Sequence, residues 1–102
     1  MSIDDAQKAD RLIVQIFMKE LCRRDDEDNH IADSEPNRRP NVFPIEEIRK
    51  AVLGEYSLDI IKSALRGHML ENIGNAPLEL LDGDANVLLT DVGRGRCHEY
   101  SV

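Results

Sequence analysis

Hydrophobic positions recur at helical spacing along residues 4–22, and neither glycine nor proline interrupts them. One helical stripe is formed by Ala6, Ala9, Ile13, Ile16, Phe17 and Leu21. Further apolar residues lie outside this stripe, so the predicted helix needs apolar cover on more than one face. That cover is either the domain's own core or a second copy of the chain. The dimerisation candidates are Ile13, Ile16, Phe17 and Leu21.

The pattern breaks off after Cys22, and residues 23–41 contain almost no apolar side chain. This stretch holds two prolines, an acidic run that begins at Asp25 and an arginine pair near each end. Such a composition is typical of a solvated linker or long loop. A chain of 102 residues is long enough for one domain. We divide that single domain into an N-terminal helix at 1–22, a polar linker at 23–42 and a C-terminal part at 43–102.

Two helices separated by a short turn are predicted in the C-terminal part. The first begins at Pro44, a residue that suits the first helical position, and ends before Gly54. Ser57 is placed to cap the second helix, which extends over 57–72. The inner stripe of this second helix is formed by Leu58, Ile61, Leu65 and Met69.

Two short strands follow, at 78–81 and 86–90, around the hairpin signal Asp82-Gly83-Asp84. Beyond them, Gly93 and Gly95 each disfavour a helix by about 1 kcal/mol. We therefore expect a turn and a third strand over 96–102, with a tail as the alternative. The predicted fold class is α+β and mostly helical, with about three helices and a C-terminal β-hairpin.

The composition narrows the choice of function. Aromatic residues make up 4% of the chain and tryptophan is absent, so we expect an aliphatic core and no base-stacking surface. The formal net charge of −7 is unusual for a nucleic-acid-binding protein, although the local field at one face counts for more than the sum. Residues 43–102 carry six basic and ten acidic side chains, a net of −4.

The compartment is predicted from what the sequence lacks. No apolar run approaches the ~18–20 residues that a membrane-spanning helix needs, so no membrane partner is expected. The acidic N-terminus has no apolar segment of the kind found in secretory signals. A cytoplasmic location is therefore predicted, in which Cys22 and Cys97 stay reduced.

Catalytic and metal-binding chemistry finds little support in the spacing of residues. The three histidines and two cysteines show no CxxC or HxxxH pattern, and Cys97-His98 is the only close pair. A zinc site built in three dimensions from Cys22, Cys97 and a histidine stays open as an alternative. The sequence shows no Gly-rich phosphate loop and nothing that would activate a cysteine nucleophile. We expect a protein that is not an enzyme and has no cofactor and no metal.

The segment from Leu81 to Arg94, LDGDANVLLTDVGR, resembles the wing of bacterial and archaeal winged helix-turn-helix transcriptional regulators. In that family, a turn of the Asp-Gly kind precedes a strand that ends Leu-Thr-x-x-Gly-Arg. The resemblance covers residues 43–95, about half of the chain, and includes the helix pair ahead of the hairpin. It implies that the second helix of the pair enters the DNA major groove and that the wing lies over the adjacent backbone.

Carried over by position, the resemblance implies six DNA-contacting residues. They are Ser57, Lys62, Ser63 and Arg66 on the helix, together with Arg94 and Arg96. Arg94 would lie near the base of the wing, or Arg94 and Arg96 would both lie at a second turn. This chain departs from the family pattern because acidic residues accompany those cations. The acidic residues are Asp59 and Glu71 on the helix and Asp82 and Asp84 in the wing turn.

Two main functions are compatible with these features. The first is a DNA-binding transcriptional regulator that acts as a homodimer, so its partners are DNA and a second copy of the chain. The alternative is a non-catalytic winged-helix module that contacts another protein through an acidic surface. A third interpretation is an acidic accessory protein of a different fold that also has helices and a hairpin, and fold alone does not determine function.

Overall fold

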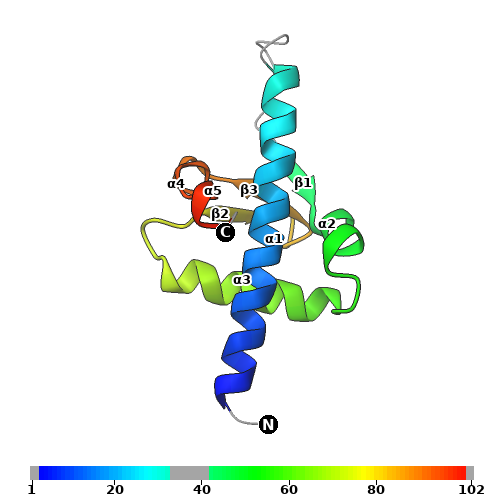
Figure 1. The fold of residues 1–102 in the computed structure, drawn as a ribbon, viewed down its shortest axis with the longest axis vertical. Helices are drawn as coiled ribbons and strands as arrows, with labels where there is room; N and C mark the ends of the chain where they lie inside the picture. The colour runs from blue at the N-terminus through cyan, green and yellow to red at the C-terminus, as the bar shows by residue number, and fades with distance from the viewer. Residues whose placement is uncertain (1–2, 33–41, 101–102) are drawn as a thin grey trace.

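The computed structural model describes residues 3–32 and 42–100, with side chains described for 10–27 and 42–100. The predicted α+β, mostly helical fold class is confirmed, with three main helices followed by a C-terminal β-hairpin (Figure 1). The elements are α1 (Ile3–Ala32), β1 (Val42–Pro44), α2 (Ile45–Val52), α3 (Leu58–Glu71), β2 (Leu78–Leu81), β3 (Asn86–Leu89), α4 (Asp91–Gly95) and α5 (Cys97–Tyr100).

The first helix is longer than the hydrophobic pattern predicts. α1 continues to Ala32 instead of ending at Cys22, so the expectation of a linker is wrong for residues 23–32. Residues 33–41 of the expected linker lie outside the described residues, and its last residue, Val42, begins β1. α1 runs across the other elements and projects beyond them at both ends (Figure 1). Within the described residues, neither α1 nor any other helix is apolar over enough of its length to cross a membrane.

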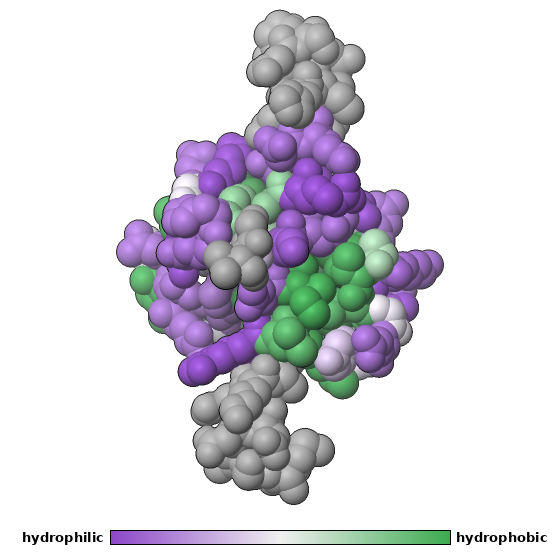
Figure 2. All heavy atoms as spheres, in the orientation of Figure 1, coloured by the Kyte–Doolittle hydropathy of each residue, from purple (hydrophilic) through white to green (hydrophobic). Residues whose placement is uncertain are grey.

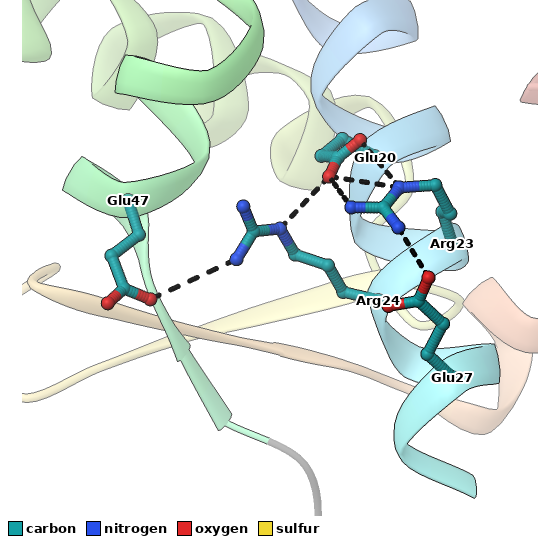
Figure 3. A network of polar contacts seen from close by, with 5 residues as sticks. All are labelled: Glu20, Arg23, Arg24, Glu27 and Glu47. Carbon is teal, nitrogen blue, oxygen red and sulfur yellow. Dashed lines mark hydrogen bonds and ion pairs between the residues drawn. The ribbon is translucent and has the colours of Figure 1, made fainter. Parts of the chain in front are cut away.

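Ion pairs along one side of α1 explain why its polar extension is helical. No proline occurs in this part of the sequence before Pro36. Arg23 pairs with Glu20 on the preceding turn and, at 2.6 Å, with Glu27 on the next (Figure 3). Such pairs stabilise a helix by about 0.2–0.5 kcal/mol each. The acidic composition that suggests a linker is therefore also compatible with a helix when arginines lie one turn away.

The same network joins α1 to α2. Arg24 lies 3.1 Å from Glu20 within α1 and 3.9 Å from Glu47 of α2 (Figure 3). Arg23 is the main cause that lowers the pKa of Glu20, and Arg24 adds to the effect. Glu20 is therefore held in its charged form between two guanidinium groups.

The three strands form one antiparallel sheet in the order β1-β3-β2. β2 and β3 form the predicted hairpin, in which Leu80 lies opposite Val87. β1 pairs with the other edge of β3 and places Phe43 opposite Val87. The third strand therefore comes from the segment ahead of α2, and the expectation of a strand over 96–102 is wrong for residues 96–100, while residues 101 and 102 lie outside the described ones. β1 ends at Pro44, which is tolerated because β1 is an edge strand.

Two short helices occupy the C-terminal residues instead of a strand. Thr90 begins α4, since its hydroxyl accepts a hydrogen bond from the Gly93 N–H at 3.1 Å. Gly93 is required there because a Cβ atom would lie 2.0 Å from the carbonyl oxygen of Pro77. The helix penalty of glycine is outweighed at this position by the close approach that only glycine permits.

A single apolar core lies between the helices and the sheet. It is mostly aliphatic, as the composition predicts, and Phe17 and Tyr100 are its only buried aromatic residues within the described part of the chain. Its fully buried side chains are Ile13, Phe17, Met18, Leu21, Ile45, Ile48, Leu53, Ile61, Leu65, Leu78, Val87 and Leu89. Burial of each large apolar side chain contributes about 1.5–3 kcal/mol, so α1 is an integral part of the domain.

A disulfide bond joins Cys22 of α1 to Cys97 of α5, whose Cα atoms lie 5.9 Å apart. The expectation that both thiols stay reduced is therefore wrong. The two cysteines are 75 residues apart and belong to different elements, so spacing along the sequence gives no sign of the pair. The bond fixes the C-terminal helices to the middle of α1.

Candidate nucleic-acid interface

The turn between α2 and α3 sets the position of the candidate recognition helix. Arg49 pairs with Glu46 at 2.6 Å and donates a hydrogen bond to the carbonyl oxygen of Tyr56 at 3.1 Å. Ser57 caps α3, since its hydroxyl accepts a hydrogen bond from the Ile60 N–H at 3.3 Å. The Ser57 hydroxyl, a predicted DNA contact, therefore serves as the N-cap of α3.

The outer face of α3 is the surface that the sequence assigns to a DNA groove. Ser63 and Arg66 lie exposed on it, whereas Lys62 is half-buried. Lys62 faces the start of α2, where it adds to the lowering of the pKa of Glu46 that Arg49 mainly causes. The exposed side chains of α3 also include two acids, Asp59 and Glu71. The charges of this helix therefore cancel.

Two aliphatic side chains share the exposed surface of α3. Ile60 is 48% exposed and Leu70 is 69% exposed, and neither contributes to the core. The outer face of α3 is therefore partly apolar. This property was not predicted, since only polar residues of this helix were considered as contacts.

The β2–β3 turn lies beside α3 and is tied to it. Arg66 forms an ion pair with Asp84 in the turn, which links residues 18 positions apart. Asp82, Gly83 and Asp84 have φ angles of 54°, 66° and 67°, a region that aspartate enters more readily than most residues. The Asp82 carboxylate accepts a hydrogen bond from Asn86 at 2.6 Å. The acidic residues of the turn therefore build its geometry.

The Leu-Thr-x-x-Gly-Arg segment lies at a junction and not at the tip of the hairpin. The Thr90 hydroxyl donates to the carbonyl oxygen of Ala76 at 2.7 Å, in addition to capping α4. Arg94 donates two hydrogen bonds to Asp25 of α1, at 2.9 and 3.2 Å. This contact raises the pKa of Arg94. The polar side chains of the segment therefore connect α4 to the rest of the molecule.

Asp25 is the residue that sequence reasoning missed. It falls in the acidic run predicted to be solvated, yet it is buried. Its partner Arg94 is 69 residues away, so the pattern around Asp25 contains no signal of the contact. Asp25, Arg94 and the Cys22–Cys97 disulfide together fasten α4 and α5 to α1.

Arg96 is also engaged within the molecule. Its guanidinium donates to Glu99 at 2.8 Å and to the side-chain oxygen of Asn72 at 3.0 Å. The Glu99 carboxylate is the main cause that raises the pKa of Arg96. Arg96 thus lies where α4 and α5 meet the end of α3, and these two short helices stand in place of the second turn at which it was predicted.

His68 connects α3 to α5. Its Nε2 atom lies 3.3 Å from the Tyr100 hydroxyl, and the two rings meet edge to face with centroids 6.4 Å apart. Burial is the main cause that lowers the pKa of His68, and the Arg96 charge adds to it. Burial also raises the pKa of Tyr100. Both groups are therefore neutral near pH 7 and act in packing.

The four residues proposed for dimerisation cover the core of a single chain. Ile13, Phe17 and Leu21 are fully buried, and Ile16 is half-buried against the same core. Of the two kinds of cover considered for this helix, the chain's own core therefore accounts for these side chains. Self-association through this helix stays a prediction.

Metal binding was tested against the geometry of the possible ligands. Among residues 3–32 and 42–100, no group of three or more His, Cys, Asp and Glu side chains is placed to hold a metal ion. Cys22 and Cys97, the ligands of the alternative zinc site, are bonded to each other. Of the residues predicted to contact DNA, Ser63 and Arg66 lie exposed on α3 beside the β2–β3 turn.

Comparison of this chain with protein families, with curated proteins and with solved structures yields no match.

Proposed function

We propose that this chain is a winged helix-turn-helix domain that binds DNA and acts as a transcriptional regulator. In this proposal α3 enters the major groove and the β2–β3 turn is the wing. The observation that supports it is the order helix, strand, helix, helix, strand, strand, with the sheet order β1-β3-β2. This order is consistent with a winged helix, and α3 keeps an exposed face beside the hairpin turn.

The contacts proposed for DNA are few and centred on Arg66. Arg66 and Ser63 supply donors for base edges or phosphates, and Lys62 supplies a phosphate contact at the border of the face. On binding, Arg66 would break its ion pair with Asp84 and donate to an acceptor on the DNA. Because acidic residues surround these groups, we expect modest affinity that weakens steeply with salt.

The first experiment measures retardation of DNA by the protein over a salt series. Replacement of Lys62 or Arg66 by alanine should weaken binding by about 1 kcal/mol each, because each loses a phosphate or base contact. Arg11→Ala is the matched control, since Arg11 is an exposed cation on α1, outside the proposed interface. Equal affinities for all three variants and the wild type would remove α3 from the interface.

A second variant is expected to strengthen DNA binding instead of weakening it. Asp84→Asn removes a negative charge from the wing and releases Arg66, so DNA binding should become tighter. Asparagine tolerates the positive φ of this position, so the turn should keep its shape. Unchanged affinity in Asp84→Asn would contradict the exchange of Asp84 for a DNA acceptor.

Contact with another protein is the second candidate function. The observation that favours it is the exposure of Ile60 and Leu70 on the outer face of α3, next to an acidic turn. Aliphatic side chains in these positions suit a protein surface better than a phosphate backbone. Absence of DNA retardation even at low salt would favour this candidate over the first.

The proposal places the protein in the cytoplasm, where DNA is accessible, and assigns it neither a catalytic step nor a cofactor. The Cys22–Cys97 disulfide is unusual for that compartment, in which most thiols are kept reduced. Alkylation of thiols in rapidly quenched cells, followed by mass measurement, would report the state of both cysteines. Two alkylated cysteines would support a cytoplasmic location, and none would point to an oxidising one.

A further inference from the structure

The Cys22–Cys97 disulfide lies in the wall of an open groove along α1. This groove has a volume of about 800 Å³, and both cysteines line it and are half-buried. A disulfide enclosed in a core is shielded from reagents, whereas one that lines an open groove can be attacked by a thiolate. The bond is therefore accessible while the protein is folded.

The groove has charged side chains near the disulfide and an apolar part further along. Lys19 and Asp26 line it one turn before and one turn after Cys22, and both are exposed. Ile16 and Val52 line the apolar part. Figure 2 shows apolar surface beside the middle of α1, on the side of α2. Because sites for small molecules have volumes of about 300–1,000 Å³, a small organic thiol fits in this groove.

The short helix α5 connects the disulfide to the C-terminal end of α3. Arg96, directly ahead of α5, donates to the side chain of Asn72 at 3.0 Å, and the Tyr100 hydroxyl lies 3.3 Å from Nε2 of His68. Asn72 is the C-cap of α3 and donates to the His68 carbonyl oxygen at 2.8 Å. A helix of four residues is not stable by itself, so the position of α5 depends on its contacts. The bond at Cys97 therefore restrains α5 and, through α5, the end of α3.

α4 has attachments that do not involve sulfur. The Thr90 hydroxyl donates to the carbonyl oxygen of Ala76, and Arg94 donates to Asp25 of α1. These contacts hold α4 whether or not the disulfide is present. Loss of the bond should therefore affect the chain from residue 96 onward.

We infer that the Cys22–Cys97 disulfide is an exchange site for small organic thiols, which reach it through the groove while the core stays folded. Reduction releases α5 from α1 and loosens residues 68–72 at the end of α3. This inference goes beyond the proposed function, because the reaction with thiols does not require DNA.

The reaction proceeds in two exchange steps. A reagent thiolate attacks one sulfur of the disulfide and forms a mixed disulfide, while the other cysteine leaves as a thiolate and takes up a proton. A second reagent thiolate then attacks the reagent sulfur of the mixed disulfide. This step releases the second cysteine, and the reagent leaves as its own disulfide. Two electrons pass from the reagent to the protein, and dithiothreitol supplies both thiols in one molecule.

The first experiment measures the rate at which dithiothreitol reduces the oxidised full chain. Samples are quenched with acid and alkylated, and their mass reports the state of both cysteines. The rate should be proportional to the dithiothreitol concentration and unchanged by urea below the unfolding transition. A rate that rises steeply with urea, or that levels off at high dithiothreitol, would mean that reduction requires unfolding and would overturn the inference.

Charge variants test whether the thiolate enters through the groove. Because the attacking group is an anion, Lys19→Glu should slow reduction and Asp26→Lys should accelerate it, each by about threefold at low salt. Lys50→Glu is the matched control, since Lys50 is an exposed cation of α2 outside the set of residues that line the groove. Circular dichroism confirms that each variant is folded. Equal rates for Lys19→Glu and Lys50→Glu would overturn entry through the groove.

Amide hydrogen exchange locates the region that reduction releases. Exchange should increase at least about tenfold in residues 96–100 and 68–72 and stay the same in β1 and α2. A variant with serine at positions 22 and 97 should match the reduced wild type and should not respond to dithiothreitol. Equal exchange in the oxidised and reduced states, or an increase that extends over β1 and α2, would overturn the release of α5. None of these measurements involves DNA, so a failure of the thiol exchange and a failure of the proposed function are observed separately.

Discussion

Two arginine–aspartate pairs join separate elements of this chain, and water reaches them to different extents. Asp25, the partner of Arg94, has a side chain that is 4% exposed, whereas Asp84, the partner of Arg66, is 26% exposed. The first pair holds α4 against α1, and the second connects α3 to the hairpin turn. A buried carboxylate without its partner is costly, whereas an exposed pair contributes little.

The two ion pairs differ in how many other contacts accompany them. The α4–α5 junction is secured by the disulfide, by the Thr90 hydrogen bonds and by the Asp25–Arg94 pair. Among the described residues, α3 is linked to the hairpin turn by the side chains of the Arg66–Asp84 ion pair. A junction with several restraints keeps its shape, and a single exposed pair can open for a ligand.

The largest effect on stability is expected from breaking the covalent bond between α1 and α5. Reduction of the Cys22–Cys97 bond, which spans 75 residues, should lower the free energy of unfolding by about 4 kcal/mol. The physical reason is the entropy that the unfolded chain regains when its loop is released. Urea denaturation with and without reductant measures the difference. A variant with serine at both positions should be indifferent to reductant, and equal midpoints for the oxidised and reduced wild type would contradict the prediction.

A smaller effect distinguishes the two ion pairs directly. Asp25→Asn should lower the free energy of unfolding by about 2 kcal/mol, because the charged acceptor that Arg94 loses lies on the buried side of the pair. Asp84→Asn makes the same chemical change in the exposed pair and should cost at most about 0.5 kcal/mol, since solvent screens both partners. Thermal or chemical denaturation of both variants gives the comparison. Equal losses would mean that burial does not separate the two pairs.

The smallest effect on stability is expected from the titration of His68, which connects α3 to α5. Burial lowers the pKa of His68 below its ordinary value of 6.5, so the folded state favours the neutral ring. The unfolded chain then binds more protons, and stability that is present above pH 6.5 should decrease as the pH falls below it. Denaturation midpoints measured between pH 7.5 and about pH 5 test the slope. His68→Gln should flatten it, and an unchanged slope would assign the dependence to other groups.

The sequence predicts those parts of the fold that local contacts determine. Ser57 caps α3 as expected, and the inner stripe of α3 packs inward, with Ile61 and Leu65 fully buried. The Asp82–Asp84 segment forms the turn of the predicted hairpin. Each of these features follows from residues within a few positions of one another, so spacing and residue type are sufficient to predict them.

The features that were missed depend on contacts between distant residues. The Asp25–Arg94 pair and the Cys22–Cys97 bond both connect α1 to the C-terminal helices, and neither leaves a local pattern. The end of α1 was misplaced because composition was weighed without the pairs that Arg23 makes one turn away. For the candidate interface, the predicted face of α3 bears Ser63 and Arg66, but its apolar side chains were not considered.

The disulfide also changes the topology of the covalent chain. From Cys22 to Cys97 the backbone forms a closed ring that contains α2, α3 and all three strands. A single backbone cut anywhere inside this ring leaves both fragments attached to each other. The oxidised protein can therefore be nicked once by a protease without losing a piece, and the two fragments separate only after the bond is reduced and the fold opens.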